Sequence, residues 1–243
     1  DAYGVSRAGR MRFLQEAIAA TRRGAGEDMV LGVRLSGEEK DHHGVEIDEM
    51  LEVCAAMDAN PALDYLNVTA GTSAGLAGST HIVPPMAYEA AYTAPIAAAI
   101  KARVSKPVFV AGRINQPQIA VAVLQSGQAD MCGMTRALIS DPQMPAKAAR
   151  GAISDIRACV ACNQACIGHM LNACAISCIQ HPETGRELEF GNLVPTTSQK
   201  RIMVAGGGPA GMKAACIAAA RGHEVTLYET AGALGGQVNL AQL

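Results

Sequence analysis

Helix-like and strand-like patterns of apolar residues alternate along the first 151 residues of the chain. The strand-like segments are short and almost continuously apolar, which is typical of parallel strands that are buried on both faces of a sheet. Each is followed by a longer segment with helical spacing, so the pattern predicts an α/β fold, either a (β/α) barrel or a doubly wound sheet. Strands are expected at 30–36, 64–70, 107–112 and 129–134, and helices at 11–23, 46–59, 92–103, 116–127 and 137–150.

The same pattern predicts how the chain is divided. Four strand–helix units are half of what a closed barrel needs, and the sequence begins without an initiator Met, so we expect a fragment that starts within this domain. A cysteine-rich segment and a polar, linker-like stretch follow. From Arg201 a strand, a glycine-rich turn, a helix and a second strand make the start of another domain. The expected parts are 1–151, 152–198 and 199–243.

Composition narrows the class of protein. The chain has 243 residues, of which 49% are hydrophobic and 17% charged, as in folded globular proteins. A net charge of −2 and an aromatic content of 3% argue against nucleic-acid binding, which needs a basic surface or rings for stacking bases. No apolar run is long enough to span a membrane. We therefore expect a cytoplasmic protein with a small-molecule substrate, and its oligomeric state stays open.

The cysteines are unevenly distributed. A disulfide framework is typical of short secreted chains, whereas a local cluster in a long chain indicates a metal site in a reducing compartment. Isolated cysteines in apolar segments are expected to be buried. The clustered cysteines are Cys159, Cys162, Cys166, Cys174 and Cys178, and the isolated ones are Cys54, Cys132 and Cys216.

Four of the clustered cysteines form the pattern C-x2-C-x3-C-x11-C. Thiolates bind both zinc and iron–sulfur clusters. Three closely spaced thiolates on a turn can hold one face of a cubane cluster, and a fourth closes it, whereas structural zinc more often uses two separated C-x2-C pairs. The spacing therefore favours a cluster and leaves zinc open, with Cys174 as a spare thiol. The expected ligands are Cys159, Cys162, Cys166 and Cys178.

A glycine motif, G-x-G-x-x-G, follows the predicted strand RIMVA and opens the next helix. Glycines allow a tight turn there and let a pyrophosphate approach the helix N-terminus. The following strand, EVTLYE, ends in Glu229, eighteen residues after the last glycine, where a carboxylate can accept a ribose hydroxyl. The motif predicts a dinucleotide site that contains Gly206, Gly208, Gly211 and Glu229.

Arginines recur near the carboxyl ends of three predicted strands. The active site of a barrel lies at that end, and the loops after its last two strands often bind phosphate. We therefore expect a phosphate site after the last two predicted strands. The residues concerned are Arg34 near the first strand, and Gly112, Arg113 and Arg136 near the last two.

One motif points to a chemistry that we do not expect. The segment 71–75, GTSAG, matches the G-x-S-x-G pattern of serine hydrolases. The serine of such a motif sits on a turn that leads directly into a helix, and the residues that follow here are rich in glycine and proline and predict a loop. His42 and His43 lie in a charged loop and are expected to be solvated.

Taken in order, these segments resemble the flavin- and iron–sulfur-containing branch of the Old Yellow Enzyme family. That branch includes 2,4-dienoyl-CoA reductase, trimethylamine dehydrogenase and related demethylases. The resemblance covers nearly the whole chain. It is carried by DAYGVSRAGRMRF, GVRLSGEE, VAGRINQPQIA, MTRALISDPQMPAKA, CVACNQACIGHM with CIQHP, and VAGGGPAGMKAACIAAARGHEVTLYE with GALGGQ.

The resemblance implies an FMN-binding (β/α)8 barrel, a [4Fe–4S] cluster held by the four cysteines, and an FAD or ADP site at the glycine motif. The chain would hold the second half of the barrel, the cluster segment and the start of the dinucleotide domain. Arg34 is assigned to the pyrimidine side of the flavin, where its charge would stabilise the anionic reduced ring. The FMN phosphate is assigned to Gly112, Arg113 and Arg136.

The expected function is electron transfer between FMN, the cluster and a second redox partner, either NAD(P)H or an electron-transfer protein. Dienoyl-CoA reductases carry a Trp-His pair where this chain has Thr72-Ser73, and His81 comes eight residues later. The loop looks more like that of amine-demethylating relatives, so we expect oxidative N-demethylation of a small methylated amine. The alternatives are NAD(P)H-dependent reduction of a 2,4-dienoyl-CoA and a non-catalytic, zinc-stabilised nucleotide-binding module. No catalytic residue is assigned, and the fragment alone is expected to bind its cofactors weakly.

Overall fold

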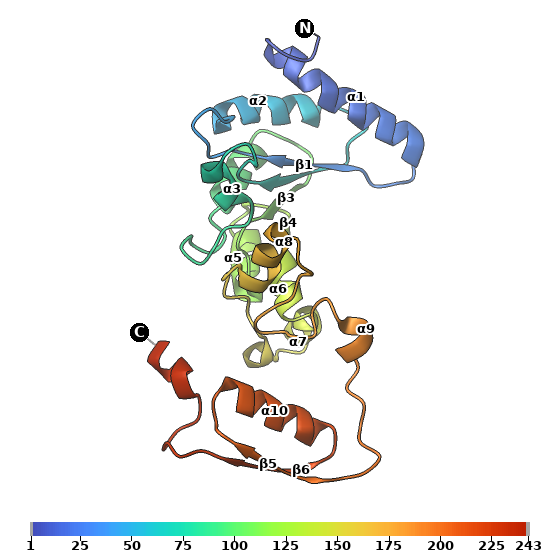
Figure 1. Ribbon diagram of the computed structural model, residues 1–243. Helices are drawn as coiled ribbons and strands as arrows, with labels where there is room; N and C mark the ends of the chain where they lie inside the picture. Colours follow the sequence, from blue (N-terminus) through green and yellow to red (C-terminus); the bar gives the residue numbers. More distant parts are fainter. Residues whose placement is uncertain (1, 242–243) are drawn as a thin grey trace. The chain divides into compact units, whose positions relative to one another are not determined.

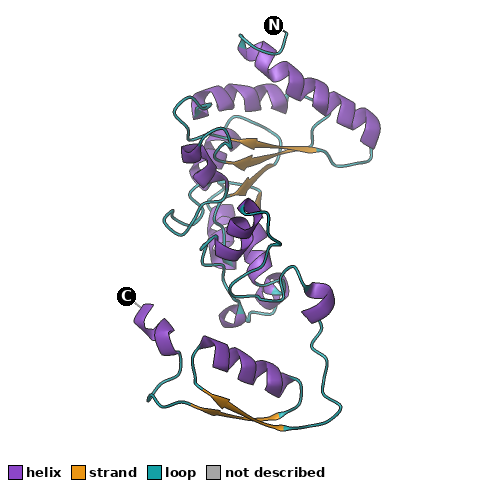
Figure 2. Cartoon of the chain, in the orientation of Figure 1, coloured by secondary structure: helices purple, strands orange, loops and turns teal. Residues whose placement is uncertain are grey.

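The computed structural model describes residues 2–241 and divides them into two compact units, the first ending at Thr184 and the second beginning at Gly185 (Figure 1). Each unit has its own parallel sheet with helices packed against it (Figure 2). Among the described residues, no helix combines the length and apolar character needed to cross a bilayer.

The sheet of the first unit follows the order of the sequence. All neighbouring strands are parallel, and each lies within its predicted range. Parallel neighbours need a crossover connection, which helices supply here, and sequential order is the arrangement found in (β/α) barrels. The strands are β1 (Gly32–Ser36), β2 (Tyr65–Thr69), β3 (Val108–Ala111) and β4 (Met131–Gly133).

Several helices of this unit begin at recognisable start signals. The Ser6 hydroxyl accepts a hydrogen bond from the Gly9 N–H at 3.1 Å, so the first helix starts earlier than its apolar spacing predicted. Prolines occupy the first turn of three later helices, where no N–H is needed. The helices are α1 (Arg7–Ala25), α2 (Ile47–Asp58), α3 (Leu76–Ile82), α4 (Ala94–Lys101), α5 (Pro117–Gln125), α6 (Thr135–Ser140) and α7 (Met144–Ala149).

Two expectations about helices were wrong. The single helix expected at 137–150 is broken into α6 and α7, because Pro142 lacks an N–H and holds Asp141 in an extended conformation. The expected loop after β2 contains α3. There the Gly78 N–H donates to the Asp41 carboxylate at 3.2 Å, so a tertiary contact outweighs the low helix propensity of glycine.

The two faces of the sheet differ in character. Leu66, Val68, Val108 and Val110 are fully buried and pack into a core with residues of α2 and α4. Alternate strand residues point to the opposite face. That face carries Arg34, Asn67 and Phe109, which are neighbours in register across β1, β2 and β3.

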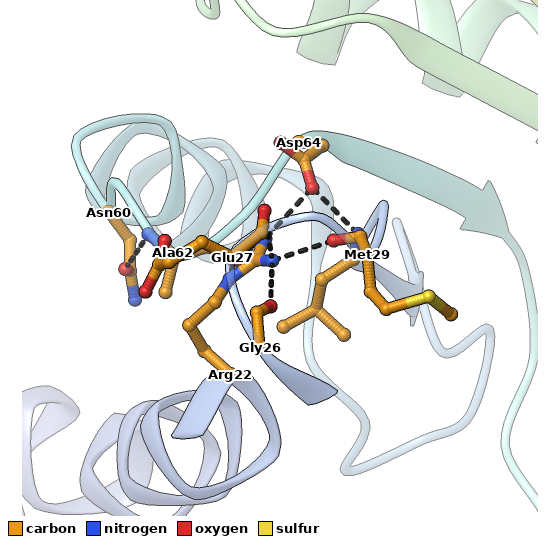
Figure 3. Close-up of polar contacts among 8 residues, drawn as sticks. Arg22, Gly26, Glu27, Met29, Asn60, Ala62 and Asp64 are labelled. Atoms are coloured by element: carbon orange, nitrogen blue, oxygen red, sulfur yellow. Dashed lines mark hydrogen bonds and ion pairs between the residues drawn. The ribbon is translucent and has the colours of Figure 1, made fainter. Parts of the chain in front are cut away.

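A buried arginine joins the end of α1 to the start of β2 (Figure 3). Arg22 is 9% exposed, and its guanidinium donates to the Ala62 carbonyl at 2.8 Å, the Met29 carbonyl at 2.6 Å and the Asp64 carboxylate at 2.9 Å. Asp64 also accepts the Leu31 N–H at 2.6 Å, which ties the start of β1 to the same network. Because a buried charge is stable only when it is paired, this arginine is a structural element of the first unit.

The cysteine segment is anchored to the α6–α7 junction. Asp141 is 5% exposed and accepts hydrogen bonds from Lys147 Nζ at 2.6 Å and from the Arg157 N–H at 2.9 Å. Gln180 Nε2 donates to the Ala158 carbonyl at 2.7 Å, which joins the end of the cysteine segment to its beginning. Its short elements are a 3-10 turn (Ile153–Asp155), a π-helical turn (Gln164–Gly168) and α8 (His169–Leu171).

The second unit is a parallel strand pair with one helix packed against both strands. Cys216 lies on the exposed side of this helix, so its expected burial was wrong, whereas Cys54 is fully buried in the first unit. A helix that covers one sheet buries one side only, which explains the difference. The elements are α9 (Glu187–Phe190), β5 (Arg201–Ala205), α10 (Pro209–Ala220), β6 (Glu224–Tyr228) and a 3-10 helix (Gly236–Ala241).

Candidate functional site

A pocket of about 230 Å³ opens beside the carboxyl ends of β3 and β4. The loop after α3 and the start of the cysteine segment complete its wall. All the residues expected at the flavin line this one pocket, although they come from strand β1, the turn after β3 and the helix after β4. They are Arg34, Gly112, Arg113 and Arg136.

Arg136 lies in the first turn of α6, directly after β4, and is half-buried. Its Nη2 donates to the Pro84 carbonyl at 2.8 Å, and its Nη1 donates to Asn163 Oδ1 at 2.7 Å. A guanidinium has five N–H donors and stays protonated, so these two contacts orient the group and leave donors for an anion. Arg136 therefore has donors available for an anion, and its assignment as a phosphate ligand stays a prediction.

The turn after β3 has an unusual backbone. Arg113 has a left-handed conformation with φ of +52°, its carbonyl accepts the Ala91 N–H at 3.1 Å, and its guanidinium donates to the Tyr88 carbonyl. A strained non-glycine residue of this kind is held in place by its surroundings and is frequent at functional sites. At Gly112 a side chain would collide with Thr93 Oγ1, so packing alone already requires glycine there.

Arg34 stands apart from the other two arginines. It lies on β1, is exposed, and is in register with Asn67 on the face of the sheet away from the helical core. Asn67 Oδ1 is buried and has no hydrogen-bond partner within the described part of the chain. An exposed cation and an unsatisfied acceptor side by side make this face suitable for a polar ring edge.

The four expected ligand cysteines line one small cavity of about 20 Å³. Cys174 does not line it, and its exposed thiol donates to the Asn172 carbonyl at 3.5 Å. Burial raises the pKa of Cys159, and the nearby Cys166 and Cys178 thiols raise it further. The structure thus brings together Cys159, Cys162, Cys166 and Cys178 and separates them from the fifth cysteine.

The four cysteines line a cavity and are not grouped around a single metal-ion position. No group of three His, Cys, Asp or Glu side chains between residues 2 and 241 is arranged for a single metal ion. In a [4Fe–4S] cluster each thiolate binds a different iron, so its ligands are spread around a larger body. Ile139, Val160 and Ile179 contribute apolar side chains to the lining, which would keep water from such a group. The donor set fits a cluster, and the ligand assignment stays a prediction.

Two residues line both cavities. Arg136 and Cys159 belong to the wall of the 230 Å³ pocket and also to the wall of the cysteine cavity. Asn115 Nδ2 supports this shared wall by donating to the Cys159 carbonyl at 2.7 Å. A group bound in the pocket would therefore lie next to a group bound by the cysteines.

In the second unit the glycine motif forms the turn between β5 and α10. Gly206 has φ of +104°, and a side chain at Gly211 would collide with the Gly206 carbonyl, so the turn itself requires both glycines. A side chain at Gly208 would meet no described atom within 4 Å. Close approach of a ligand is a reason for glycine at that position, as in dinucleotide-binding turns.

Glu229 directly follows β6 and lies beside this turn. Its carboxylate accepts the Ala231 N–H at 2.8 Å and the Gly207 N–H at 2.6 Å, and these hydrogen bonds lower the pKa of Glu229. The carboxylate is therefore charged and fixed by the glycine loop. A carboxylate has about four acceptor positions, so a ribose hydroxyl can still bind.

The GTSAG segment needs a correction. The argument against a nucleophile elbow assumed a loop after Ser73, yet α3 begins at Leu76. The histidine on that helix, His81, is hydrogen-bonded to the hydroxyls of Tyr88 and Tyr92 at 3.4 and 3.3 Å, and burial lowers its pKa. The side chain of His81 is thus hydrogen-bonded to two tyrosines and, among the described residues, forms no hydrogen bond with Ser73, so the nucleophile–base pair of a serine hydrolase is not formed.

Two polar residues at the site were missed from the sequence. Asn163 lies inside the cysteine motif, and Asp141 lies in the segment after β4. Asn163 acts through hydrogen bonds to residues 27 and 80 positions away, which no local pattern reveals, whereas the partners of Asp141 lie 6 and 16 positions further along the chain. A weak signal existed at Asn163, because asparagine is the residue other than glycine that most often adopts the left-handed conformation found there.

Comparison with known proteins identifies the family. Residues 1–154 match the model of the NADH:flavin oxidoreductase / NADH oxidase family, and residues 204–242 match the NAD(P)-binding Rossmann-like domain. The chain belongs to the NADH:flavin oxidoreductase / NADH oxidase family. The expected fold class is confirmed, with a part of a (β/α)8 barrel followed by the start of a Rossmann-like domain.

Three proteins illustrate the range of enzymes to which the chain is similar. The metal reductase of Desulforamulus reducens is 40% identical, and N,N-dimethylglycine/sarcosine dehydrogenase of Chromohalobacter salexigens is 38% identical; each alignment covers 99% of this chain and 35% of the relative. A solved structure of 2-naphthoyl-CoA reductase with 2-naphthoyl-CoA matches with a TM-score of 0.90 at 31% identity, over 99% of this chain and 36% of the other. The chain thus spans about a third of the length of these proteins.

Proposed function

We propose that this chain forms the phosphate side of an FMN site and the adjoining [4Fe–4S] site of an oxidoreductase that N-demethylates a small methylated amine. The observation that carries the proposal is the wall that the two cavities share at Arg136 and Cys159. Two redox groups bound on either side of one wall can exchange electrons directly. A zinc-stabilised binding module would have no use for this arrangement.

The side chains of the pocket have separate tasks. Arg136 and Arg113 supply fixed positive charge for the phosphate, and Arg34 supplies charge at the polar edge of the ring. When bound, FMN supplies two-electron chemistry and the cluster accepts electrons one at a time. The apolar side chains around the thiols exclude water from the second site. The glycine loop and Glu229 would hold FAD or ADP, with NAD(P)H or an electron-transfer protein as the further partner.

The choice of an amine substrate rests on the groups available for proton transfer. Oxidation of such an amine breaks a C–H bond of an N-methyl group, and the hydrogen with its two electrons would leave as a hydride equivalent to FMN when that cofactor is bound. Water then adds to the iminium carbon, and formaldehyde and the demethylated amine are released. This needs no acid to protonate a carbon. The described lining of the pocket contains no histidine, tyrosine or carboxylate, and His81 is held by two tyrosines instead. Similarity to N,N-dimethylglycine/sarcosine dehydrogenase supports the same choice.

The second candidate is reduction of an unsaturated acyl-CoA. Such a reaction needs a proton donor near the substrate carbon, which the described pocket lacks. Its support is the high structural similarity to 2-naphthoyl-CoA reductase, an enzyme that acts on a CoA ester. The two candidates differ in the direction of electron flow at the flavin, so one experiment separates them.

The test is anaerobic mixing of the full-length oxidised protein with dimethylglycine, N-methylproline or dimethylamine. We expect bleaching of the flavin absorbance and release of formaldehyde with at least one of them. Glycine and proline, which lack the N-methyl group, are the matched controls and should leave the flavin oxidised. Absence of bleaching with every amine, together with rapid NAD(P)H-driven reduction of a 2,4-dienoyl-CoA, would favour the second candidate.

A further inference from the structure

Asn163 connects three segments that are far apart in the sequence. It lies between the second and third ligand cysteines, with a left-handed backbone at φ of 55° and ψ of 14°. Its Oδ1 accepts a hydrogen bond from Arg136 Nη1 at 2.7 Å, and its Nδ2 donates to the Val83 carbonyl at 2.7 Å. An arginine only donates and a carbonyl only accepts, so one orientation of the amide satisfies both partners.

Arg136 closes the network from the other side. Its Nη2 donates to the carbonyl of Pro84, the residue after Val83, at 2.8 Å, and Pro84 itself is buried. Three hydrogen bonds thus hold the guanidinium, the asparagine amide and one stretch of backbone together. Arg136 lines both the pocket and the cysteine cavity, whereas Asn163 lines the cysteine cavity.

We propose that Asn163 is a positioning residue that makes retention of the FMN phosphate depend on the folded state of the cysteine segment. The inference rests on the proposed function. When the metal centre is assembled, its ligands fix the backbone on both sides of Asn163, and the amide then holds Arg136 ready for the phosphate. When the centre is lost, the amide is free to move and Arg136 loses one of its two fixed partners. Binding at the two sites is then coupled in both directions.

The sequence offers a clean substitution to test this role. Asn163→Gly keeps the left-handed backbone, which glycine adopts freely, and removes only the amide. Ala173→Gly is a matched control, because Ala173 lies in the same segment, is exposed, and also has a positive φ of 54°. A second variant, Asn163→Asp, tolerates the same backbone, pairs its carboxylate with Arg136 and cannot donate to Val83.

The experiment measures the FMN dissociation constant of the full-length protein by flavin fluorescence, before and after removal of the bound iron with a chelator. We expect removal of iron to weaken FMN binding roughly tenfold in the wild type and in Ala173→Gly, the equivalent of one hydrogen bond to a charged group. Asn163→Gly should bind FMN roughly tenfold more weakly from the start. Removal of iron should then change its affinity little.

Several outcomes would overturn the inference. The inference is contradicted if Asn163→Gly or Asn163→Asp binds FMN as tightly as Ala173→Gly does. It is also contradicted if iron removal lowers the FMN affinity equally in the wild type and in Asn163→Gly. If circular dichroism shows that Asn163→Gly does not fold, the FMN affinity of Asn163→Asp is used as the test instead. A wild-type protein that binds no FMN contradicts the proposed function itself, which distinguishes the two failures.

Discussion

Arg136 is the residue on which the phosphate end of the pocket depends most directly. It is half-buried, oriented by Pro84 and Asn163, and placed at the wall between both cavities. A charge-assisted hydrogen bond is worth about 1.5–3 kcal/mol. We therefore expect Arg136→Ala in the full-length protein to weaken FMN binding by about ten- to a hundredfold.

Flavin occupancy after dilution measures this effect. Arg103→Ala is a suitable control, because Arg103 is exposed at the end of α4 and lies outside both cavities. Equal flavin occupancy in the two variants would show that Arg136 is not a phosphate ligand.

The choice among the five clustered cysteines is a second question at this scale. Cys178 lines the cysteine cavity, whereas Cys174 is exposed beside the Asn172 carbonyl. We expect Cys174→Ser to keep the iron content of the full-length protein and Cys178→Ser to lose most of it. Metal analysis of the two purified variants checks this, and the reverse result would refute the ligand assignment.

Single residues also show which features of the site could be predicted from the sequence and which could not. That the four cysteines line one cavity and the three arginines one pocket could be expected from the sequence, because the cysteine spacing is local and each arginine lies near the carboxyl end of a predicted strand. Their roles as ligands stay predictions. Asn163 was not, since its partners lie 27 and 80 residues away. Cys216 was misjudged because an apolar sequence predicts burial only where another element covers that side of the helix.

At the level of elements, the strands were predicted most accurately. Each is short and mostly apolar, and each lies within its predicted range. The helix predictions were wrong where one signal competed with another. Pro142 broke an otherwise continuous apolar spacing, and the contact between Gly78 and Asp41 formed a helix in a segment whose composition predicts a loop.

The junction of α6 and α7 makes stability depend on pH. Burial raises the pKa of Asp141, but the hydrogen bonds from Lys147 and the Arg157 N–H outweigh it, so the pKa is lowered. Such a carboxylate stabilises the fold above its unfolded pKa of about 4, and this contribution is lost as the pH falls through the folded-state pKa. Asp141→Asn should therefore be less stable than the wild type near neutral pH, with a difference that shrinks in acid.

Urea unfolding at a series of pH values measures this dependence. Asp28→Asn, at an exposed carboxylate in the loop before β1, is the control and should follow the wild type. A deficit of Asp141→Asn that stays constant down to the most acidic pH would contradict the role given to the ionised carboxylate.

For the molecule as a whole, the order of parts explains the site. The turns after β3 and β4 carry the arginines, and the chain continues from α7 directly into the cysteine segment, which folds back beside them. The order of the elements along the chain therefore places the two cavities on either side of one shared wall, without any long connecting segment. The strands and their parallel pairing followed from the sequence pattern, but the shared wall did not, because it depends on side-chain hydrogen bonds between segments.

The central claim is that a flavin and an iron–sulfur cluster occupy these neighbouring cavities. The most direct test is the content of flavin, iron, acid-labile sulfide and zinc in the full-length protein, purified without oxygen. We predict bound FMN together with iron and sulfide in equal amounts, as a [4Fe–4S] cluster requires. Zinc without iron or sulfide, or a protein without flavin, would contradict the account.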